Sequence, residues 1–162
     1  MITLVLGGAR SGKSEVGERL AATLGPKVTY VATAVVDPSD DDWASRIDKH
    51  RARRPPTWTT VEAGPDLPGV VAALTGPVLL DSLGTWVAGC LVPDADALCH
   101  ALTHRDGPTV VVSEEVGLGV HPSTDAGRAF RDALGTVNRA VADVADKVLL
   151  VVAGRVLPLA RP

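Results

Sequence analysis

Short runs of consecutive apolar residues recur along this chain, and segments with apolar residues three or four positions apart separate them. The runs are rich in β-branched residues and end at glycine, proline or small polar residues, which is typical of strands covered on both faces. The predicted strands are residues 2–6, 27–33, 57–62, 77–82, 109–113 and 148–152. The predicted helices are residues 13–24, 40–53, 66–74, 83–91 and 125–145, with a further piece around 96–102. This alternation predicts an α/β fold, with a mostly parallel, doubly wound sheet flanked by helices.

The helix predicted at residues 125–145 has the clearest amphipathic pattern. Its expected apolar face consists of Ala129, Phe130, Ala133, Leu134, Val137 and Val141. Arg128, Arg131 and Asn138 are the expected polar counterparts. For the tail at residues 155–162, an edge strand and a loose end both remain open.

Composition limits the class of protein. A length of 162 residues suggests a single domain, residues 1–162, and no apolar run approaches the roughly 20 residues that span a bilayer. The N-terminus lacks the pattern of a signal segment, so we expect a cytoplasmic protein. The net charge of −3 does not suggest a nucleic-acid partner. Cys90 and Cys99 are expected to be free, buried thiols in a reducing compartment.

Between the first predicted strand and helix, the chain matches the phosphate-loop pattern G-x-x-x-x-G-K-[ST] at every constrained position. The matching residues are Gly7, Gly8, Ala9, Arg10, Ser11, Gly12, Lys13 and Ser14. Glycines let the backbone wrap around a phosphate, and the helix N-terminus adds a partial positive charge. Lys13 is expected to reach the β- and γ-phosphates of a nucleotide, and Ser14 to ligate Mg²⁺. The alternative is a chance glycine-rich turn, which the strand–loop–helix context makes less favourable.

Polar residues end several of the other predicted strands, where open α/β sheets bind ligands. Asp81 follows a buried strand and is expected to position Mg²⁺, although an aspartate there can also cap a helix. Thr33 is a candidate neighbour of the nucleotide or Mg²⁺, or a turn residue. Glu62 either forms an exposed salt bridge or contacts a ligand. Glu114 and Glu115 follow another predicted strand at the same edge.

Basic residues gather at the end of the helix predicted at residues 40–53. His50 lies one turn after Arg46, and Arg51, Arg53 and Arg54 follow. One explanation for this basic block is that positive charges at the C-terminal end of a helix interact favourably with its macrodipole. The other is a clamp for a triphosphate with an imidazole in its midst.

Taken together, these blocks resemble the bifunctional adenosylcobinamide kinase / adenosylcobinamide-phosphate guanylyltransferase family, from residue 1 to about 154. The blocks are residues 7–14 and 30–33; Arg46, Ile47, His50, Arg51, Arg54, Pro55 and Trp58; residues 80–83 with Trp86 and Val87; Ser113 with residues 115–120; and Arg128, residues 130–132, Gly135 and Asn138. Many families share the phosphate loop, whereas the His50 block and the block at residues 115–119 are more specific.

The resemblance implies a RecA-like phosphate-loop enzyme with two activities. It would phosphorylate a hydroxyl of adenosylcobinamide with a nucleoside triphosphate, ATP or GTP. It would then transfer GMP from GTP to that phosphate, through a GMP–histidine intermediate on His50. The implied nucleotide contacts are the phosphate loop, Thr33, Ala34, Val35, Arg51, Ala52, Arg53, Arg54, Glu62 and Asp81. The resemblance also implies a homo-oligomer, with a trimer as the expected form.

The chain departs from the family pattern at several points. Glu114 stands where the family usually has asparagine, and His121 replaces a usual apolar residue. Residues 88–107 form a shorter segment than the family's, and the closing lysine is missing. Two alternatives remain: a kinase without guanylyl transfer, in which His50 is structural, and a non-catalytic nucleotide-binding module. The absence of an [NT]-K-x-D motif weighs against a Ras-like switch.

Overall fold

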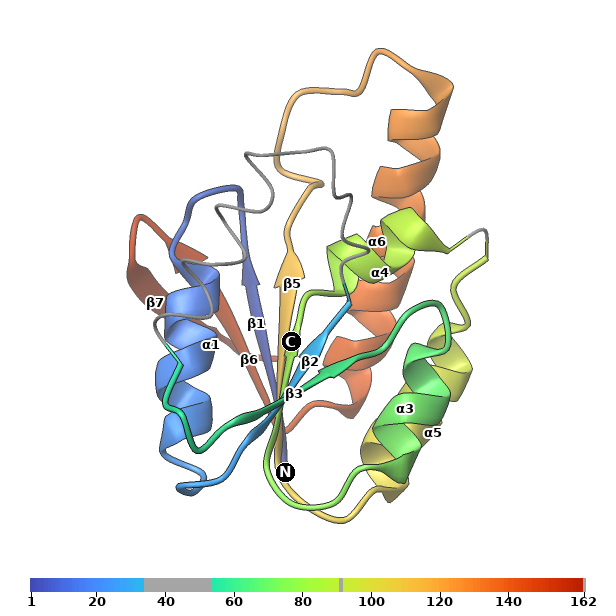
Figure 1. Ribbon diagram of the computed structural model, residues 1–162. Coiled ribbons are helices and arrows are strands. Elements are labelled where there is room, and N and C mark those ends of the chain that lie inside the picture. Colours follow the sequence, from blue (N-terminus) through green and yellow to red (C-terminus); the bar gives the residue numbers. More distant parts are fainter. Residues whose placement is uncertain (34–53, 91, 162) are drawn as a thin grey trace.

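The computed structural model describes residues 1–33, 54–90 and 92–161. Its strands are β1 (Ile2–Gly7), β2 (Thr29–Ala32), β3 (Thr59–Glu62), β4 (Val78–Asp81), β5 (Thr109–Glu114), β6 (Lys147–Val152) and β7 (Arg155–Leu159). Its helices are α1 (Lys13–Ala22), α3 (Leu67–Ala73), α4 (Leu83–Gly89), α5 (Ala95–His104) and α6 (Asp125–Val144). The predicted α/β fold is confirmed (Figure 1).

The strands form one sheet in the order β3-β2-β4-β5-β1-β6-β7. Neighbouring strands from β3 to β6 run parallel, and β7 pairs with β6 antiparallel. Helix α1 covers one face, and α3, α4, α5 and α6 lie on the other (Figure 1). Because β1 to β6 are parallel, their carboxyl ends meet at a single edge, the edge to which sequence analysis assigns ligand binding.

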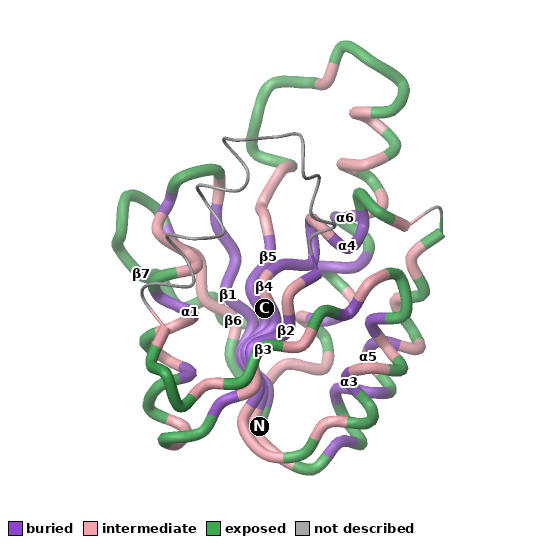
Figure 2. Tube along the Cα trace, viewed as in Figure 1, coloured by how far each residue is buried: buried purple, intermediate pink, exposed green. Residues whose placement is uncertain are grey.

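The inner strands β1, β4 and β5 are buried on both sides because each side faces helices. In β1, Leu4 and Leu6 belong to the core shared with α6, whereas Val5 packs with Val16 of α1. Leu4 is paired with Val111 of β5 on one side and with Val148 of β6 on the other. Buried positions therefore concentrate along the strands (Figure 2).

Most predicted elements agree with the structure to within a few residues. The piece expected around residues 96–102 is the longer α5, which begins after Asp94, whose carboxylate accepts a hydrogen bond from Ala97 N at 2.9 Å. The tail forms β7 by pairing with β6. The helix predicted at residues 40–53 lies outside the described residues.

Three details of the prediction are wrong. Ala129, expected on the apolar face of α6, is exposed. Asn138, expected among the polar counterparts, is buried, because its amide bonds to β5. Cys90 and Cys99 have free thiols, but both are only half-buried.

Within the described ranges, no helix is both long and apolar enough to cross a bilayer.

Candidate phosphate-binding site

The predicted phosphate loop connects β1 to α1 in a tight turn. Gly12, at the N-cap of α1, has a φ of 91°, a left-handed conformation that favours glycine. No side chain caps this helix end, so the first amides of α1 are left to face a ligand. Ser11 N donates to Gly8 O at 3.3 Å, and Gly154 N, from the turn between β6 and β7, donates to Ser11 O at 2.8 Å. The loop is thus held in shape by the neighbouring hairpin.

Two further observations fit an anion inside this loop. A Cβ on Gly7 would overlap Ser11 Oγ and would lie 2.9 Å from Val151 O, so the close approach requires glycine. Ser11 Oγ is buried and has no hydrogen-bond partner among the described residues. A buried hydroxyl without a partner is costly, and a phosphate oxygen is an acceptor that would satisfy it.

Ser14 and Asp81 come together beside the loop. Ser14 Oγ, in the first turn of α1, lies 3.4 Å from Asp81 Oδ1 at the end of β4. The helix-cap interpretation of Asp81 is wrong, because Ser82 occupies the N-cap position of α4. The pair instead brings two hard oxygen donors together beside the phosphate loop.

Tyr30 was missed by sequence reasoning. Its hydroxyl donates to Asp81 Oδ2 at 3.3 Å, and the Arg54 guanidinium lies 3.7 Å from the centre of its ring. Burial, followed by the negative charge of Asp81, raises the pKa of Tyr30 above its usual value, so the phenol stays protonated and remains a donor. Arg54 also donates to Thr60 Oγ1 at 3.1 Å. The last residue of the basic block therefore lies against β2, one side chain away from Asp81.

Thr33 joins the end of β2 to the start of α4. Its hydroxyl lies 2.6 Å from Ser82 O and 2.5 Å from Thr85 Oγ1, and it accepts from Ser82 N at 3.0 Å. The side chain is buried. These bonds hold the junction after Asp81, and a direct contact between Thr33 and a nucleotide remains a prediction.

Glu114 contacts the lysine of the phosphate loop. Its Oε1 lies 3.4 Å from Lys13 Nζ, and its Oε2 accepts from Ser82 Oγ and Gly84 N, both at 3.0 Å. Asn138 Nδ2 donates to the backbone oxygen of Glu114 at 3.0 Å. Sequence reasoning missed the parts that Ser82, Gly84 and Asn138 play, although Ser82 and Gly84 follow the signalled Asp81 by one and three residues.

The remaining predicted site residues divide into two groups. Glu62 is exposed at the end of β3, and β2, β4 and β5 separate that strand from β1, so it is not brought to the phosphate loop. Ala34, Val35, His50, Arg51, Ala52 and Arg53 lie outside the described residues.

The donor set suits Mg²⁺ better than a metal held by protein alone. No group of three or more histidine, cysteine, aspartate or glutamate residues within the described ranges can hold a metal ion. Mg²⁺ at nucleotide sites typically takes one or two protein oxygens and completes its shell with phosphates and water. Ser14 Oγ and the Asp81 carboxylate match that requirement.

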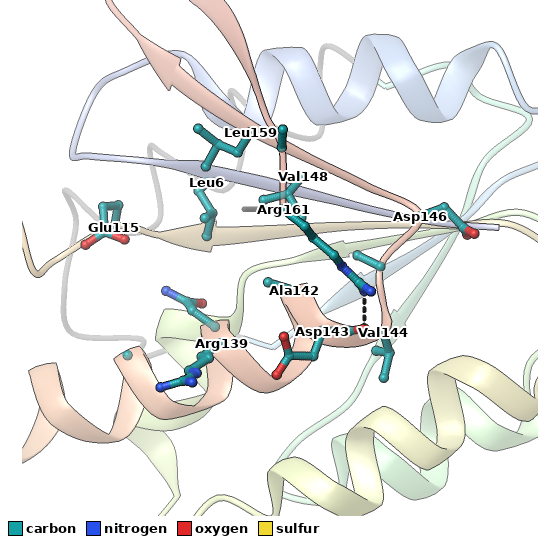
Figure 3. A pocket seen from close by; sticks show the side chains of 14 residues that line it. Leu6, Glu115, Arg139, Ala142, Asp143, Val144, Asp146, Val148, Leu159 and Arg161 are labelled. Atoms are coloured by element: carbon teal, nitrogen blue, oxygen red, sulfur yellow. Dashed lines mark hydrogen bonds between the residues drawn. The ribbon is translucent and has the colours of Figure 1, made fainter.

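A separate groove of about 850 Å³ lies between α6 and the hairpin of β6 and β7 (Figure 3). Ala142, Val148 and Leu159 line it, and Arg161 crosses it to donate to the backbone oxygen of Asp143. No residue of the phosphate loop lines this groove. The groove does share Asn138, which donates to the Glu114 backbone oxygen, with the site at the carboxyl edge.

A parallel sheet with a phosphate loop after β1, and an aspartate two strands away at the end of β4, defines a phosphate-loop nucleotide-binding protein. Residues 3–159 match the family model described as cobinamide kinase / cobinamide phosphate guanyltransferase. The chain belongs to this family, which confirms the resemblance and with it the class of enzyme: a kinase and guanyltransferase acting on cobinamide and its phosphate.

Curated relatives agree over almost their whole length. The chain is 38% identical to the bifunctional adenosylcobalamin biosynthesis protein CobP of Pseudomonas aeruginosa, with 98% of this chain and 97% of that protein covered. It is 36% and 34% identical to the bifunctional adenosylcobalamin biosynthesis proteins CobU of Escherichia coli and Salmonella typhimurium, with 95% of this chain and 97% of each relative covered. Among solved structures, the P4 protein of bacteriophage phi6 in complex with ADP aligns at 18% identity and a TM-score of 0.42, and this chain covers about half of it (52%). That likeness is too weak to bear on function.

Proposed function

We propose that this chain carries out both reactions of its family at the carboxyl edge of the sheet. In the first, a nucleoside triphosphate, ATP or GTP, phosphorylates a hydroxyl of adenosylcobinamide. In the second, GMP passes from GTP to adenosylcobinamide phosphate through a GMP–His50 intermediate, giving adenosylcobinamide-GDP and pyrophosphate. The family match and the relatives named as bifunctional biosynthesis proteins support this proposal.

The observation that carries the phosphorylation step is the meeting of Lys13, Ser14 and Asp81 around the phosphate loop. Phosphoryl transfer needs little covalent chemistry from a protein, so positioning and charge stabilisation supply most of the catalysis. The amides of α1 and Lys13 would hold the β- and γ-phosphates. Ser14 and Asp81 would hold Mg²⁺, which neutralises charge on the transferred group when it is bound.

The guanylyl step is assigned to His50 by the family resemblance. Arg54, four residues later in the chain, lies on the ring of Tyr30, whose hydroxyl bonds to Asp81. This contact supports one shared site for the basic block and the phosphate loop. The positive charges of the block would draw in the triphosphate and stabilise the departing pyrophosphate.

The proposal also includes a cytoplasmic homo-oligomer, with a trimer as the expected form. Exposed apolar side chains on the edge strand β7, at Val156, Leu157 and Leu159, supply a surface for self-association. Sedimentation equilibrium of the purified chain measures the oligomeric state.

Labelled GTP tests both reactions in parallel. GTP labelled at the α-phosphate is expected to leave its label on the protein, in a bond that acid breaks and base does not, as for a phosphoramidate. GTP or ATP labelled at the γ-phosphate is expected to transfer its label to adenosylcobinamide. Transfer of the γ-label without protein-bound α-label would reduce the function to that of a kinase, and no transfer of either label would contradict the proposal.

A further inference from the structure

The Glu114 carboxylate is held in one orientation beside the phosphate loop. Its Oε2 accepts from Ser82 Oγ and Gly84 N at the start of α4, both at 3.0 Å. Its Oε1 lies 3.4 Å from Lys13 Nζ. The side chains of Lys13 and Glu114 are 12% and 27% exposed, so this pair differs from an ordinary surface ion pair.

The surroundings of Glu114 are shaped around this orientation. A Cβ on Gly84 would overlap Glu114 Oε2, so a side chain at that position would displace the carboxylate. Asn138 Nδ2 donates to the Glu114 backbone oxygen, and Asn138 Oδ1 accepts from Ser113 Oγ at 2.6 Å. The start of α4 and the phosphate loop thus contact the Glu114 side chain, and α6 contacts its backbone at the end of β5.

The two carboxylate oxygens have different tasks. Two donors at the start of α4 occupy Oε2, whereas Oε1 contacts only the lysine among the described residues. In phosphate-loop enzymes that lysine binds the β- and γ-phosphates of the nucleotide. If a bound triphosphate drew the ammonium to itself, Oε1 would be left as an acceptor beside the phosphate loop.

Neighbouring carboxylates are engaged in other ways. Asp81 contacts Ser14 Oγ and the Tyr30 hydroxyl through its two oxygens, and with Ser14 it forms the proposed Mg²⁺ pair. Glu115 Oε1 accepts from Gly117 N at 2.7 Å, within the loop that follows β5. Glu114 is thus the described carboxylate that contacts Lys13 without belonging to the proposed metal pair.

We propose that Glu114, which stands where the family usually has asparagine, is the proton acceptor of this chain in the phosphorylation step, a role that rests on the function proposed above. The alcohol oxygen of the substrate forms a bond to the γ-phosphorus as the bond from that phosphorus to the β,γ-bridging oxygen breaks. The nucleoside diphosphate leaves with the electron pair of that bond. The hydroxyl proton passes to Glu114 Oε1 and is lost to solvent after the product departs.

Glu114→Gln tests this role, because the amide keeps the size of the side chain and removes its ability to take a proton. We expect kcat for phosphorylation of adenosylcobinamide to fall on the order of 100-fold or more, a usual loss for a general base. Nucleotide Kd is expected to stay within about threefold, and protein labelling by GTP carrying an α-label is expected to persist, since imidazole attack needs no hydroxyl deprotonation. Asp143→Asn, which removes one exposed carboxylate on α6, is the matched control and is expected to retain wild-type kcat.

Several results would overturn the proposal. A kcat for Glu114→Gln within about threefold of wild type would exclude a proton acceptor of this kind. A loss of nucleotide affinity and α-labelling in parallel with kcat would make Glu114 a positioning residue for Lys13, and recovery of kcat with excess Mg²⁺ would make it a metal ligand. If thermal unfolding shows that Glu114→Gln does not fold, Glu114→Asp takes its place; it withdraws the carboxylate by one methylene, and unchanged kcat in that variant counts against the role. A wild-type chain that does not phosphorylate adenosylcobinamide would instead contradict the proposed function itself.

Discussion

Ser14 Oγ in the first turn of α1 lies 3.4 Å from Asp81 Oδ1 at the end of β4, although 67 residues separate them in the chain. The contact spans β5, because the sheet order places β5 between β4 and β1. Parallel strands that end at one edge make this meeting possible, and the proposed Mg²⁺ site depends on it.

Lys13→Ala is expected to lower phosphoryl transfer by orders of magnitude, because the variant loses the charge that stabilises the transferred phosphate. Steady-state kinase assays with adenosylcobinamide measure the loss. Lys27→Ala removes an exposed lysine before β2 and serves as the matched control, with activity near wild type. Near-normal turnover in Lys13→Ala would exclude the phosphate-loop assignment.

Asp81→Asn is expected to abolish most Mg²⁺-dependent activity while the fold remains stable, because the amide keeps the shape and loses the charge. Activity measured over a series of Mg²⁺ concentrations, together with thermal unfolding, checks this expectation. Asp66→Ala gives the contrasting case: Asp66 Oδ1 accepts from Gly69 N at 3.0 Å as the cap of α3, so its loss should cost about 1 kcal/mol of stability and leave activity intact. If Asp81→Asn kept its activity and lost stability instead, the metal role would be wrong.

His50→Ala is expected to abolish protein labelling by GTP carrying an α-label and to stop guanylyl transfer, while phosphorylation of adenosylcobinamide continues. The reason is that a covalent intermediate needs the imidazole, whereas the phosphate loop works without it. His100→Ala, on the exposed surface of α5, is the control and should label like wild type. Persistent labelling in His50→Ala would disprove the intermediate, and thermal unfolding of each variant separates lost chemistry from lost structure.

Raising the pH above about 10 is expected to destabilise the fold through Tyr30. An unfolded tyrosine ionises near pH 10, whereas burial and then Asp81 raise the pKa of Tyr30 in the folded chain. The unfolded state therefore releases a proton that the native state keeps. The stabilisation is complete below the unfolded pKa and is lost as pH rises towards the folded one, by up to about 1.4 kcal/mol per pH unit.

Tyr30→Phe provides the comparison for this pH effect. The free energy of unfolding of Tyr30→Phe should lack the contribution from Tyr30 ionisation. The difference in this free energy between wild type and Tyr30→Phe should therefore shrink as the pH rises above 10. Because Tyr30 is the only tyrosine in the chain, tyrosinate absorbance also reports on it alone. Appearance of tyrosinate near pH 10 in the folded protein would contradict the raised pKa.

Local patterns predicted some features well because their causes are local. The apolar runs of β1 and β5 predict strands covered on both faces, and the spacing of glycines, Lys13 and Ser14 predicts a phosphate loop. Asp94 was not recognised as a cap, so the start of α5 was placed a residue late. Errors of this kind affect the ends of elements and leave their type unchanged.

Asn138 shows where a local pattern fails. On a helix of mixed polarity an asparagine is expected to face solvent, yet this one is buried. Its amide bonds to Ser113 Oγ and to the Glu114 backbone oxygen, both on β5. Only the packing of α6 against that strand supplies these partners, and helical spacing carries no information about them.

The sequence by itself determined the class of fold, the phosphate loop and the family, because these depend on the order and spacing of residues along the chain. The tertiary structure alone decided which strand-end residues meet. It brought Asp81 to Ser14 and Tyr30, aimed Glu114 at Lys13, and left Glu62 at the far side of the sheet. Strand order and register set these distances, and they arise from packing between segments far apart in the chain, which no local pattern encodes.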